Sequence, residues 1–237
     1  MTLTGAEAHH AASVCRLRPG DAVCLFNGDG HEYAARILEV GRQSVNLEID
    51  SVACPNRELP FTLEVAAPLP KGDRAQFLIE KLTELGATTF VPLSCTHSAT
   101  QQREAKPEKL QRYVIEASKQ CGRNVLMRVE PMVECQSYFA TRRENEMRWL
   151  AHPGGKHDWP VHAIAILSVR IAVGPEGGFT DEEIGTAQAN RWALIDLGPR
   201  ILRVETAALA MACRAISWAN GQRSEPRPSG NKSSTAS

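Results

Sequence analysis

The sequence predicts an α/β protein with two parts, a small β-rich module at the N-terminus and a larger domain built on a parallel sheet. In residues 1–67, short strand-like stretches are separated by tight turns, a spacing typical of a small barrel or sandwich. From residue 71 onward, helix-like and strand-like stretches alternate, which favours a parallel sheet covered by helices. Two glycine-marked loops, at 174–179 and 197–207, each follow a short apolar run and lead into a helix.

The N-terminal module is expected to contain one short helix and four strands. Ala8, Ala11 and Cys15 recur at helical spacing, which predicts a helix over residues 7–15. Turn sequences rich in Gly, Asn, Asp and Pro separate the stretches that follow. We therefore expect strands at 22–26, 33–40, 44–49 and 61–67.

The segment Pro68-Leu69-Pro70 is the best candidate for a domain boundary, so we expect the second domain to cover residues 71–222. Thr180 and Glu183 form a capping-box pattern that marks the start of one of its helices. We expect helices at 73–85, 107–121, 136–143, 181–191 and 205–218. We expect strands at 88–94, 128–133, 147–151, 161–167, 169–173 and 193–197. Residues 223–237 are rich in Ser, Pro and Gly and are expected to form a disordered tail.

Composition excludes several classes of protein. A hydrophobic fraction of 43% and a charged fraction of 23% are those of a globular protein. No apolar run approaches the ~20 residues that span a bilayer, and no signal peptide is evident, so we expect a cytoplasmic protein without a membrane partner. The seven cysteines form no C-x-x-C pair, which argues against structural zinc and disulfides. His152, His157 and His162 recur every five residues, which is not a ligand spacing, so we expect no metal.

Charge is balanced, with 27 basic and 27 acidic residues. Nucleic-acid-binding domains are usually strongly basic. If the partner is a nucleic acid, its phosphates must therefore be contacted by a local arginine patch rather than by a global positive field.

The two glycine loops are the candidate ligand site, because ligands of open α/β sheets bind outside the carboxyl ends of the strands. The first loop, GPEGGF, is not the dinucleotide fingerprint, and it lacks the Lys and hydroxyl of a P-loop. Alone it is most simply a turn. Two adjacent loops that present backbone amides and carbonyls suit a flat heteroaromatic ligand in an apolar slot.

The pair GPEGGF at 174–179 and LGPRILRVETA at 197–207 resembles the signature of the RsmE family, methyltransferases of uracil N3 in bacterial small-subunit ribosomal RNA. Blocks at 3–21, 26–30, 80–86 and 116–123 extend the resemblance to most of residues 3–220. It implies a SPOUT methyltransferase domain with a deep trefoil knot, preceded by a small PUA-like β-barrel that binds RNA. One departure is His97, which stands where the family tends to have Arg before Ser98.

The resemblance implies an enzyme that depends on S-adenosylmethionine, methylates N3 of a specific uridine in 16S ribosomal RNA within the small ribosomal subunit, and acts as a homodimer. A second reading is a SPOUT methyltransferase of another base or of a ribose hydroxyl. A third is a non-catalytic RNA-binding ribosome-assembly factor of the same fold. The intact GPEGG and R-x-E-T strings favour the enzymes.

Three sets of residues are candidates for the site. Cofactor contacts are expected from the strand end before His152 and from both loops: Leu150, Ala151, Gly174, Pro175, Glu176, Gly177, Gly178, Phe179, Leu197, Gly198, Ile201 and Leu202. Catalytic roles are expected for Arg203, Glu205 and Arg200. RNA contacts are expected from His10, Arg16, Arg18 and Arg123.

The catalytic set follows from the chemistry of the uracil imide. N3 must lose a weakly acidic proton before it attacks, and arginine donors aimed at the two carbonyl oxygens would stabilise the resulting anion. Arg203 is the better candidate to face the base. Glu205 is either the base or the first-turn acid of the last helix. Arg123 is either an RNA contact or a solvated charge at a helix end.

Overall fold

The computed structural model describes residues 1–98, 107–156 and 168–224. The chain divides into two compact units. Unit 1 comprises Met1–Glu58 and Ile115–Leu126, and unit 2 comprises the described residues of 59–114 and of 127 onward. The expected strand at 161–167 and most of the expected tail lie outside the described residues.

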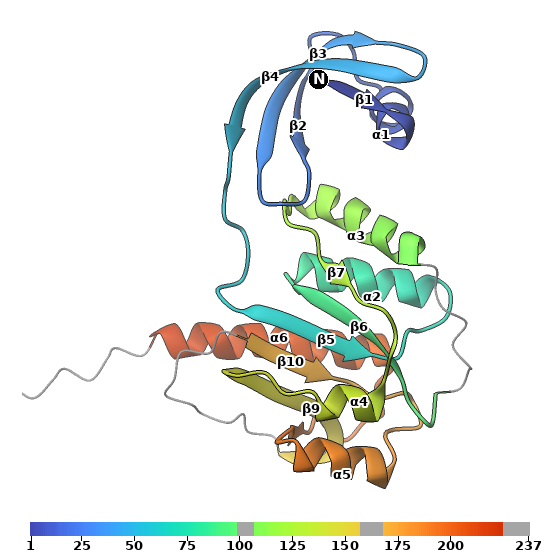
Figure 1. The fold of residues 1–237 in the computed structure, drawn as a ribbon, viewed down its shortest axis with the longest axis vertical. Coiled ribbons are helices and arrows are strands. Elements are labelled where there is room, and N and C mark those ends of the chain that lie inside the picture. The colour runs from blue at the N-terminus through green and yellow to red at the C-terminus, as the bar shows by residue number, and fades with distance from the viewer. Residues whose placement is uncertain (99–106, 157–167, 225–237) are drawn as a thin grey trace, which may run out of the picture. The chain divides into compact units, whose positions relative to one another are not determined.

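Unit 1 is an antiparallel half-barrel of four strands in the order β1-β4-β3-β2 (Figure 1). Its strands are β1 (Thr2–Thr4), β2 (Ala22–Phe26), β3 (Glu32–Val40) and β4 (Ser44–Ala53). A short helix, α1 (Gly5–His9), continues as the π-helical turn η1 (His10–Val14). Ala8 and Ala11 on this helical segment pack with Ile37 and Leu47 of the sheet to form the core of the unit.

The segment 115–126 belongs to unit 1 because its end is hydrogen-bonded to the sheet's loops. Asn124 donates to the carbonyl oxygens of Gly30 at 2.8 Å and Pro55 at 3.1 Å. Asp29 and Val125 form an isolated antiparallel bridge. These bonds tie the last turns of α3 (Pro107–Cys121) to the module formed by residues 1–58.

Unit 2 contains a parallel sheet of seven strands, in which β8 pairs with β6 beside the path β11-β9-β10-β5-β6-β7. The strands are β5 (Thr62–Ala67), β6 (Thr89–Ser94), β7 (Arg128–Val129), β8 (Val133–Glu134), β9 (Glu146–Lys156), β10 (Ser168–Ala172) and β11 (Ala193–Ile195). Every pairing within this sheet is parallel.

Strand β5 lies at the centre of this sheet, between β10 and β6. The sequence predicts that residues 61–67 belong to the N-terminal module, and the structure corrects this prediction, because the strand pairs within the sheet of unit 2. Leu63, Val65, Ala66 and Ala67 are fully buried. A strand in the middle of a parallel sheet is buried on both faces, and in β5 even the charged Glu64 is only 6% exposed, so burial on both faces distinguishes β5 from the strands of unit 1.

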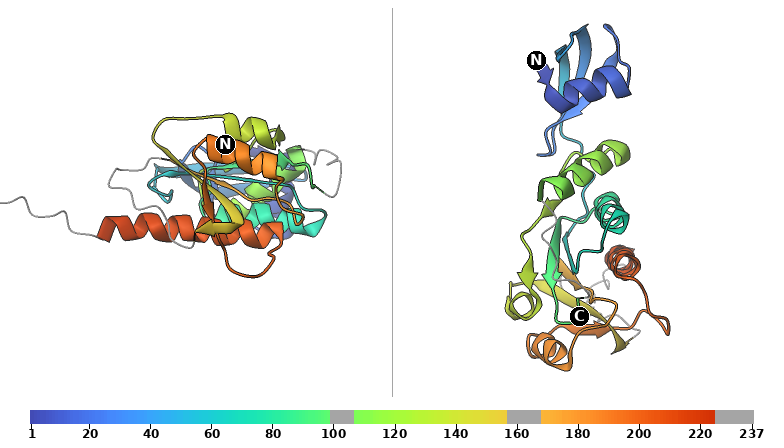
Figure 2. Two further views of the ribbon diagram at one scale, coloured as in Figure 1. Left: turned by 90° about the horizontal axis from the view of Figure 1, so that it is seen from below. Right: turned by 90° about the vertical axis from the view of Figure 1, so that its right-hand side faces the viewer.

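Helices cover both faces of the parallel sheet. The helices wholly within unit 2 are α2 (Asp73–Glu84), α4 (Cys135–Ala140), α5 (Asp181–Ala189) and α6 (Val204–Ser224). Helices α2 and α6 lie together on one face, and α4 and α5 lie on the other (Figure 2). Between the sheet and the second pair, Phe139 makes edge contacts with Phe179 at 5.4 Å and Trp192 at 5.2 Å between ring centroids.

A buried charged cluster holds the amino ends of the central strands. Glu64 of β5 accepts hydrogen bonds from Tyr138 Oη at 2.8 Å and from Arg170 Nε of β10 at 2.9 Å. Arg170 Nη1 also lies 3.4 Å from Glu146 of β9. Burial opposes ionisation of Glu64, but the charge of Arg170 and the hydrogen bond from Tyr138 outweigh it and lower the pKa of Glu64. The cluster therefore links three adjacent strands through charge-assisted hydrogen bonds.

Candidate functional site

A pocket of about 400 Å³ opens at the carboxyl end of the parallel sheet. Four segments form it: the middle of β9, the loop after β10, the loop after β11, and the first turn of α6. The carboxyl ends of neighbouring parallel strands meet at one edge, so the sequence prediction that both glycine loops lie at one site is correct. The lining residues are Ala151, His152, Pro153, Val173–Phe179, Asp196–Leu202 and Ala207.

The first loop turns tightly after β10. The Val173 amide donates to Ala66 O at 2.9 Å, and the Gly178 amide donates to Pro175 O at 2.8 Å. Gly178 has φ +74°, in the left-handed region that favours glycine. A Cβ on Gly174 would lie 3.0 Å from the ring of Phe179, so the ring packs closely on the backbone there. The loop is thereby fixed by its own aromatic residue.

The same loop is held from behind by the segment after β6. His97 Nδ1 lies 3.2 Å from the carbonyl oxygens of both Gly177 and Gly178. As a donor, this ring nitrogen holds both carbonyl groups and so fixes the path of the loop. Sequence reasoning registered His97 only as a departure from the family pattern and did not assign it a role.

The helix that follows the loop begins with the expected capping box. Thr180 Oγ1 accepts from the Glu183 amide at 3.2 Å, and Glu183 Oε2 accepts from the Thr180 amide at 2.7 Å. Glu183 Oε1 also accepts from the Thr96 amide at 2.9 Å. Burial opposes the charge of Glu183, but these amide hydrogen bonds outweigh it and lower the pKa of its carboxyl group. One carboxylate therefore joins the end of β6 to the end of the first loop.

The second loop reverses at a glycine and exposes its tip. Asp196 Oδ1 accepts from the Gly198 amide at 2.7 Å, and Gly198 has φ +105°. Arg200 lines the pocket with its side chain exposed. Ile201 is 89% exposed, which is unusual for a large apolar side chain. The tip therefore presents one cation and one apolar side chain at the rim of the pocket.

Of the expected cofactor contacts, all but one line the pocket. Leu150 is the exception, because its side chain is fully buried in the core of unit 2. Along β9 the lining begins at Ala151, so a side-chain contact from Leu150 is not supported, and its expected cofactor contact stays a prediction. Cofactor contacts were not expected from His152, Pro153, Val173, Asp196, Pro199 and Ala207, although each lies within two positions of an expected site residue.

The expected catalytic residues divide by exposure. Arg203 is exposed, and its side chain makes no hydrogen bond or ion pair with any described residue. Glu205 is 6% exposed, and its Oε2 has no hydrogen-bond partner within the described part of the chain. The Glu205 carboxylate forms an ion pair with Arg74 in the first turn of α2, whose Nη1 lies 3.7 Å from Glu205 Oε2. The same nitrogen lies 3.3 Å from Glu176 Oε1.

Arg74 thus connects the first glycine loop with the first turn of α6. Sequence spacing gave no sign of this, because Arg74 precedes Glu176 by about a hundred positions. The available signal was topological: α2 follows β5, which is the neighbour of β10 in the sheet. The arrangement places two carboxylates around one guanidinium beside the pocket.

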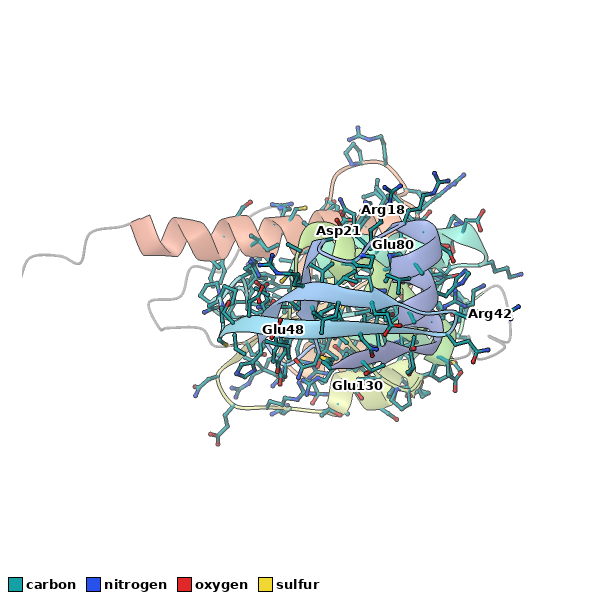
Figure 3. The ribbon with its side chains drawn as sticks, turned by 90° about the horizontal axis from the view of Figure 1, so that it is seen from above. Arg18, Asp21, Arg42, Glu48, Glu80 and Glu130 are labelled. Atoms are coloured by element: carbon teal, nitrogen blue, oxygen red, sulfur yellow. The ribbon has the colours of Figure 1, made fainter. Side chains whose placement is uncertain are left out.

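The expected RNA contacts of unit 1 are mostly accessible. Arg16 and Arg18 are exposed, and His10 is half-buried. The Arg18 amide donates to Asp21 Oδ2 at 2.8 Å, and both residues lie on the surface of the unit (Figure 3). Arg16 has φ +55° although it is not a glycine.

The structure corrects the prediction that Arg123 contacts RNA. This arginine is 4% exposed and forms a bidentate pair with Glu58, with Nε to Oε1 at 2.8 Å and Nη2 to Oε2 at 2.5 Å. A guanidinium buried and paired in this way stabilises the unit and cannot also reach a solvent-exposed phosphate. We therefore remove Arg123 from the RNA-contacting set.

No cluster of metal-ligating side chains occurs among residues 1–98, 107–156 and 168–224. His152 Nδ1 accepts from the Gly154 amide at 3.0 Å, while His157 and His162 lie outside the described residues. Within the same ranges no helix has the length and apolar character needed to cross a membrane.

Comparison with known families gives two matches. Residues 57–216 match the model of an RNA methyltransferase domain, and residues 3–50 match that of an RNA methyltransferase PUA domain. A curated relative, the ribosomal RNA small subunit methyltransferase E of Bacillus subtilis (strain 168), is 31% identical over 229 residues, which cover 92% of this chain and 89% of the relative. The protein of the same name from Synechocystis is 32% identical over 87% of this chain and 69% of its own.

Solved structures give the same result. A Legionella pneumophila protein in complex with the cofactor SAM superposes with a TM-score of 0.84 at 31% identity, covering 92% of this chain and 91% of the other. The ribosomal RNA small subunit methyltransferase E of Neisseria gonorrhoeae, bound to S-adenosyl methionine, has a TM-score of 0.82 at 26% identity with the same coverage.

Proposed function

The chain belongs to the RsmE family of RNA methyltransferases, and we propose that it transfers a methyl group from S-adenosylmethionine to N3 of a specific uridine in 16S ribosomal RNA. The observation that carries the proposal is the pocket formed by the two glycine loops, in a chain whose relatives over most of their length are ribosomal RNA methyltransferases. The reaction would take place in the cytoplasm, where the small ribosomal subunit is assembled.

The pocket fits the cofactor by size and by chemistry. Its volume of about 400 Å³ lies within the range of small-molecule sites. Val173, Leu197, Leu202 and Ala207 supply apolar walls for a planar base, and the glycine loops supply main-chain amides and carbonyls. The carboxylate of Glu176 lies at the lining and suits the positive sulfonium. When bound, S-adenosylmethionine supplies an activated methyl group.

Positioning dominates the catalysis, because methyl transfer is an in-line displacement between two held partners. N3 lies on the Watson–Crick edge of uracil, so the target base must enter the site unpaired. Arg203 is the residue we assign to the base. Its exposed guanidinium, free of ion pairs among the described residues, donates to the uracil carbonyl oxygens and stabilises the imide anion once N3 releases its proton to water.

Glu205 is assigned a positioning role. It is buried at the start of α6 and paired to Arg74, which also binds Glu176 of the first loop. A carboxylate in this setting holds Arg74 in place, and Arg74 in turn sets the position of Glu176 at the pocket. Arg200, exposed on the pocket rim, is assigned to a phosphate next to the target base.

Kinetics of variants separate these roles. Arg203→Ala should lower kcat by at least about a hundredfold while leaving the Kd for S-adenosylmethionine within about twofold, as expected for a lost oxyanion-type donor. Glu205→Gln should instead weaken cofactor binding and lower kcat together. A loss of cofactor affinity with Arg203→Ala, or a kcat defect of Glu205→Gln without any change in cofactor affinity, would contradict the assignments.

A homodimer is also proposed, with the tip of the second loop in its interface. Ile201 is 89% exposed and Phe77 of α2 is 45% exposed, and association would remove such apolar side chains from water. Sedimentation equilibrium on the full chain tests this, with a dimer expected. A monomer at assay concentrations would contradict the proposal.

The cofactor itself is tested by calorimetry with S-adenosylmethionine. Binding is expected for both enzyme readings, methylation of uracil N3 and methylation of another base or of a ribose hydroxyl. Absence of binding at millimolar cofactor would refute both and favour a non-catalytic assembly factor. The product nucleoside then separates the two enzymes, because only the first yields 3-methyluridine.

A further inference from the structure

A second pocket, of about 500 Å³, opens at the opposite edge of the parallel sheet, beside the amino end of β9. Four arginines line it: Arg142, Arg143, Arg148 and Arg191. It shares no lining residue with the pocket at the carboxyl end. Along β9 the nearest lining residues of the two pockets are Arg148 and Ala151, which are three positions apart, or about 10 Å at ~3.3 Å per residue. We call this second site the arginine pocket.

Two of these arginines are neutralised by buried carboxylates. Arg143 Nη1 lies 2.9 Å from Glu64 Oε2, and Arg148 is paired with Glu146. Glu64 and Glu146 are also the partners of Arg170, so neither carboxylate has charge to spare. When Arg170 is counted with the four lining arginines, five arginines face three glutamates, at 64, 144 and 146, so the pocket keeps a net positive charge.

The excess resides on Arg142 and Arg191. Arg142 donates from Nε to Asn190 Oδ1 at 3.1 Å and from Nη2 to Ala189 O at 3.0 Å, both of which are neutral acceptors. These two bonds immobilise the guanidinium and leave Nη1 without a partner among the described residues. Arg191 is exposed and forms no ion pair within the same part of the chain. The Arg142 guanidinium is thus fixed before a ligand binds, whereas the exposed Arg191 side chain can move to contact the ligand.

The backbone conformation at Arg191 disfavours an arginine, so packing alone does not explain why this residue occupies the position. Arg191 follows the C-cap residue of α5, Asn190, and has φ +62°. Glycine or asparagine usually occupies this position, because other L-residues are strained there. Asn145, also at the pocket, has φ +54°, so two of the three non-glycine residues with positive φ in the described ranges line this one site. An exposed arginine at such a position points to a role for its charge.

We propose that the arginine pocket binds a backbone phosphate of the RNA substrate, an inference that rests on the proposed function. An arginine fork matches the oxygens of a phosphate, and an overall neutral chain needs such local patches to hold RNA. Among the described residues no aromatic side chain lines the pocket, so they offer no surface on which a base could stack. The contact is therefore to the backbone, independent of sequence, and it positions the RNA from the far edge of the sheet.

The test is the salt dependence of RNA binding by the full chain. Naked 16S ribosomal RNA and purified small subunits, both lacking the modification, are titrated between about 50 and 200 mM salt. The pocket variant is Arg142→Gln combined with Arg191→Gln. The matched control removes two exposed cations from α3, Lys109→Gln combined with Arg112→Gln.

The pocket variant should bind naked RNA roughly fivefold more weakly at low salt, as for the loss of one net hydrogen-bonded contact. Its slope of log affinity against log salt should be smaller by about 0.7, the value for one phosphate of a single strand. Glu144→Gln, which removes the unpaired carboxylate at the pocket, should tighten binding. In turnover, KM should rise with kcat unchanged, because the pocket does not touch the reacting atoms.

Three results would overturn the proposal. The first is an equal loss in the α3 control, which would show that only net charge matters. The second is a loss with assembled subunits but not with naked RNA, which would assign the pocket to an acidic protein partner. The third is a lower melting temperature with unchanged RNA affinity, which would mean that Arg142 only caps α5. Arg191→Gly adds a variant without backbone strain, and it should bind RNA more weakly while remaining at least as stable as the parent.

Failure of this proposal is distinguishable from failure of the proposed function. Calorimetry with S-adenosylmethionine on the unmodified chain reports on the proposed function alone. The pocket variants should bind the cofactor as the unmodified chain does, because the two pockets share no residue.

Discussion

Replacing Glu64 with glutamine would remove one of the two carboxylates that neutralise buried Arg170. The glutamine keeps the size of the side chain and can still accept from Tyr138 or Arg170, which lie at 2.8 and 2.9 Å in the parent. It loses the negative charge, however, and turns an amide donor toward one of the groups that now donate to Glu64. Arg170 is 1% exposed, so water cannot replace the lost partner.

The expected destabilisation is about 3 kcal/mol. Removing one partner of a buried ion pair costs about 3–5 kcal/mol, and the low end applies because Glu146 remains 3.4 Å from Arg170. For a chain of this size that corresponds to a fall in melting temperature of about 6–12 °C. The matched control is Arg143→Gln, which removes a cation from the same carboxylate. The Arg143 side chain is 56% exposed, so its loss should cost at most about 1 kcal/mol.

The difference in stability between the parent and Glu64→Gln should also depend on pH. The folded state lowers the pKa of Glu64, so the carboxylate contributes stability above its unfolded pKa, and that contribution is lost as the pH falls through the folded value. Thermal melts at a series of pH values should therefore show the gap between parent and Glu64→Gln closing in acid. Equal effects of Glu64→Gln and Arg143→Gln, or a gap that widens in acid, would refute this account of the cluster. Cofactor affinity of the folded variant should be unchanged.

Three further predictions concern the loops and their supports. Gly155→Ala should destabilise the protein by about 1–3 kcal/mol in a thermal melt, because the new Cβ would lie 2.6 Å from the backbone of β11. The control Gly185→Ala, whose Cβ would have no described atom within 4 Å, should stabilise it by about 0.5–1 kcal/mol. Equal effects of the two substitutions would contradict the close packing at β11. Thr180→Ala should cost about 1 kcal/mol through the lost cap, and an unchanged melting temperature would count against the capping box. His97→Ala should raise the Kd for S-adenosylmethionine in calorimetry, because two loop carbonyls at 3.2 Å lose their donor; unchanged affinity would show that the loop holds itself.

Local signals in the sequence predicted those helices whose first and last residues are of types that favour the start or the end of a helix. Helix α3 begins at Pro107 and ends before Gly122, as predicted, because proline favours a first turn and glycine favours the left-handed residue that ends a helix. The capping box at Thr180 was visible for the same reason. The position of both glycine loops at one edge followed from the rule for parallel strands.

Contacts between distant residues could not be predicted in this way. The partner of Arg123 is Glu58, which is 65 positions away, so sequence reasoning saw only a helix-end charge. Arg74 was missed as the link between Glu176 and Glu205 for the same reason. Strand β5 was grouped with the wrong unit, because the prolines at 68 and 70 resemble a linker and nothing local reveals its partners β10 and β6. The trefoil knot stays a prediction, since strand order does not define it.

The central claim is tested most directly by following the methyl group into RNA. The purified chain is incubated with S-adenosylmethionine carrying an isotopically labelled methyl group and with small ribosomal subunits from cells that lack the chain, and the 16S ribosomal RNA is then digested to nucleosides for mass spectrometry. We predict that the label appears in 3-methyluridine at a single position, and that Arg203→Ala nearly abolishes it. Label in a ribose-methylated nucleoside or in another base, or no label in RNA at all, would contradict the proposed function.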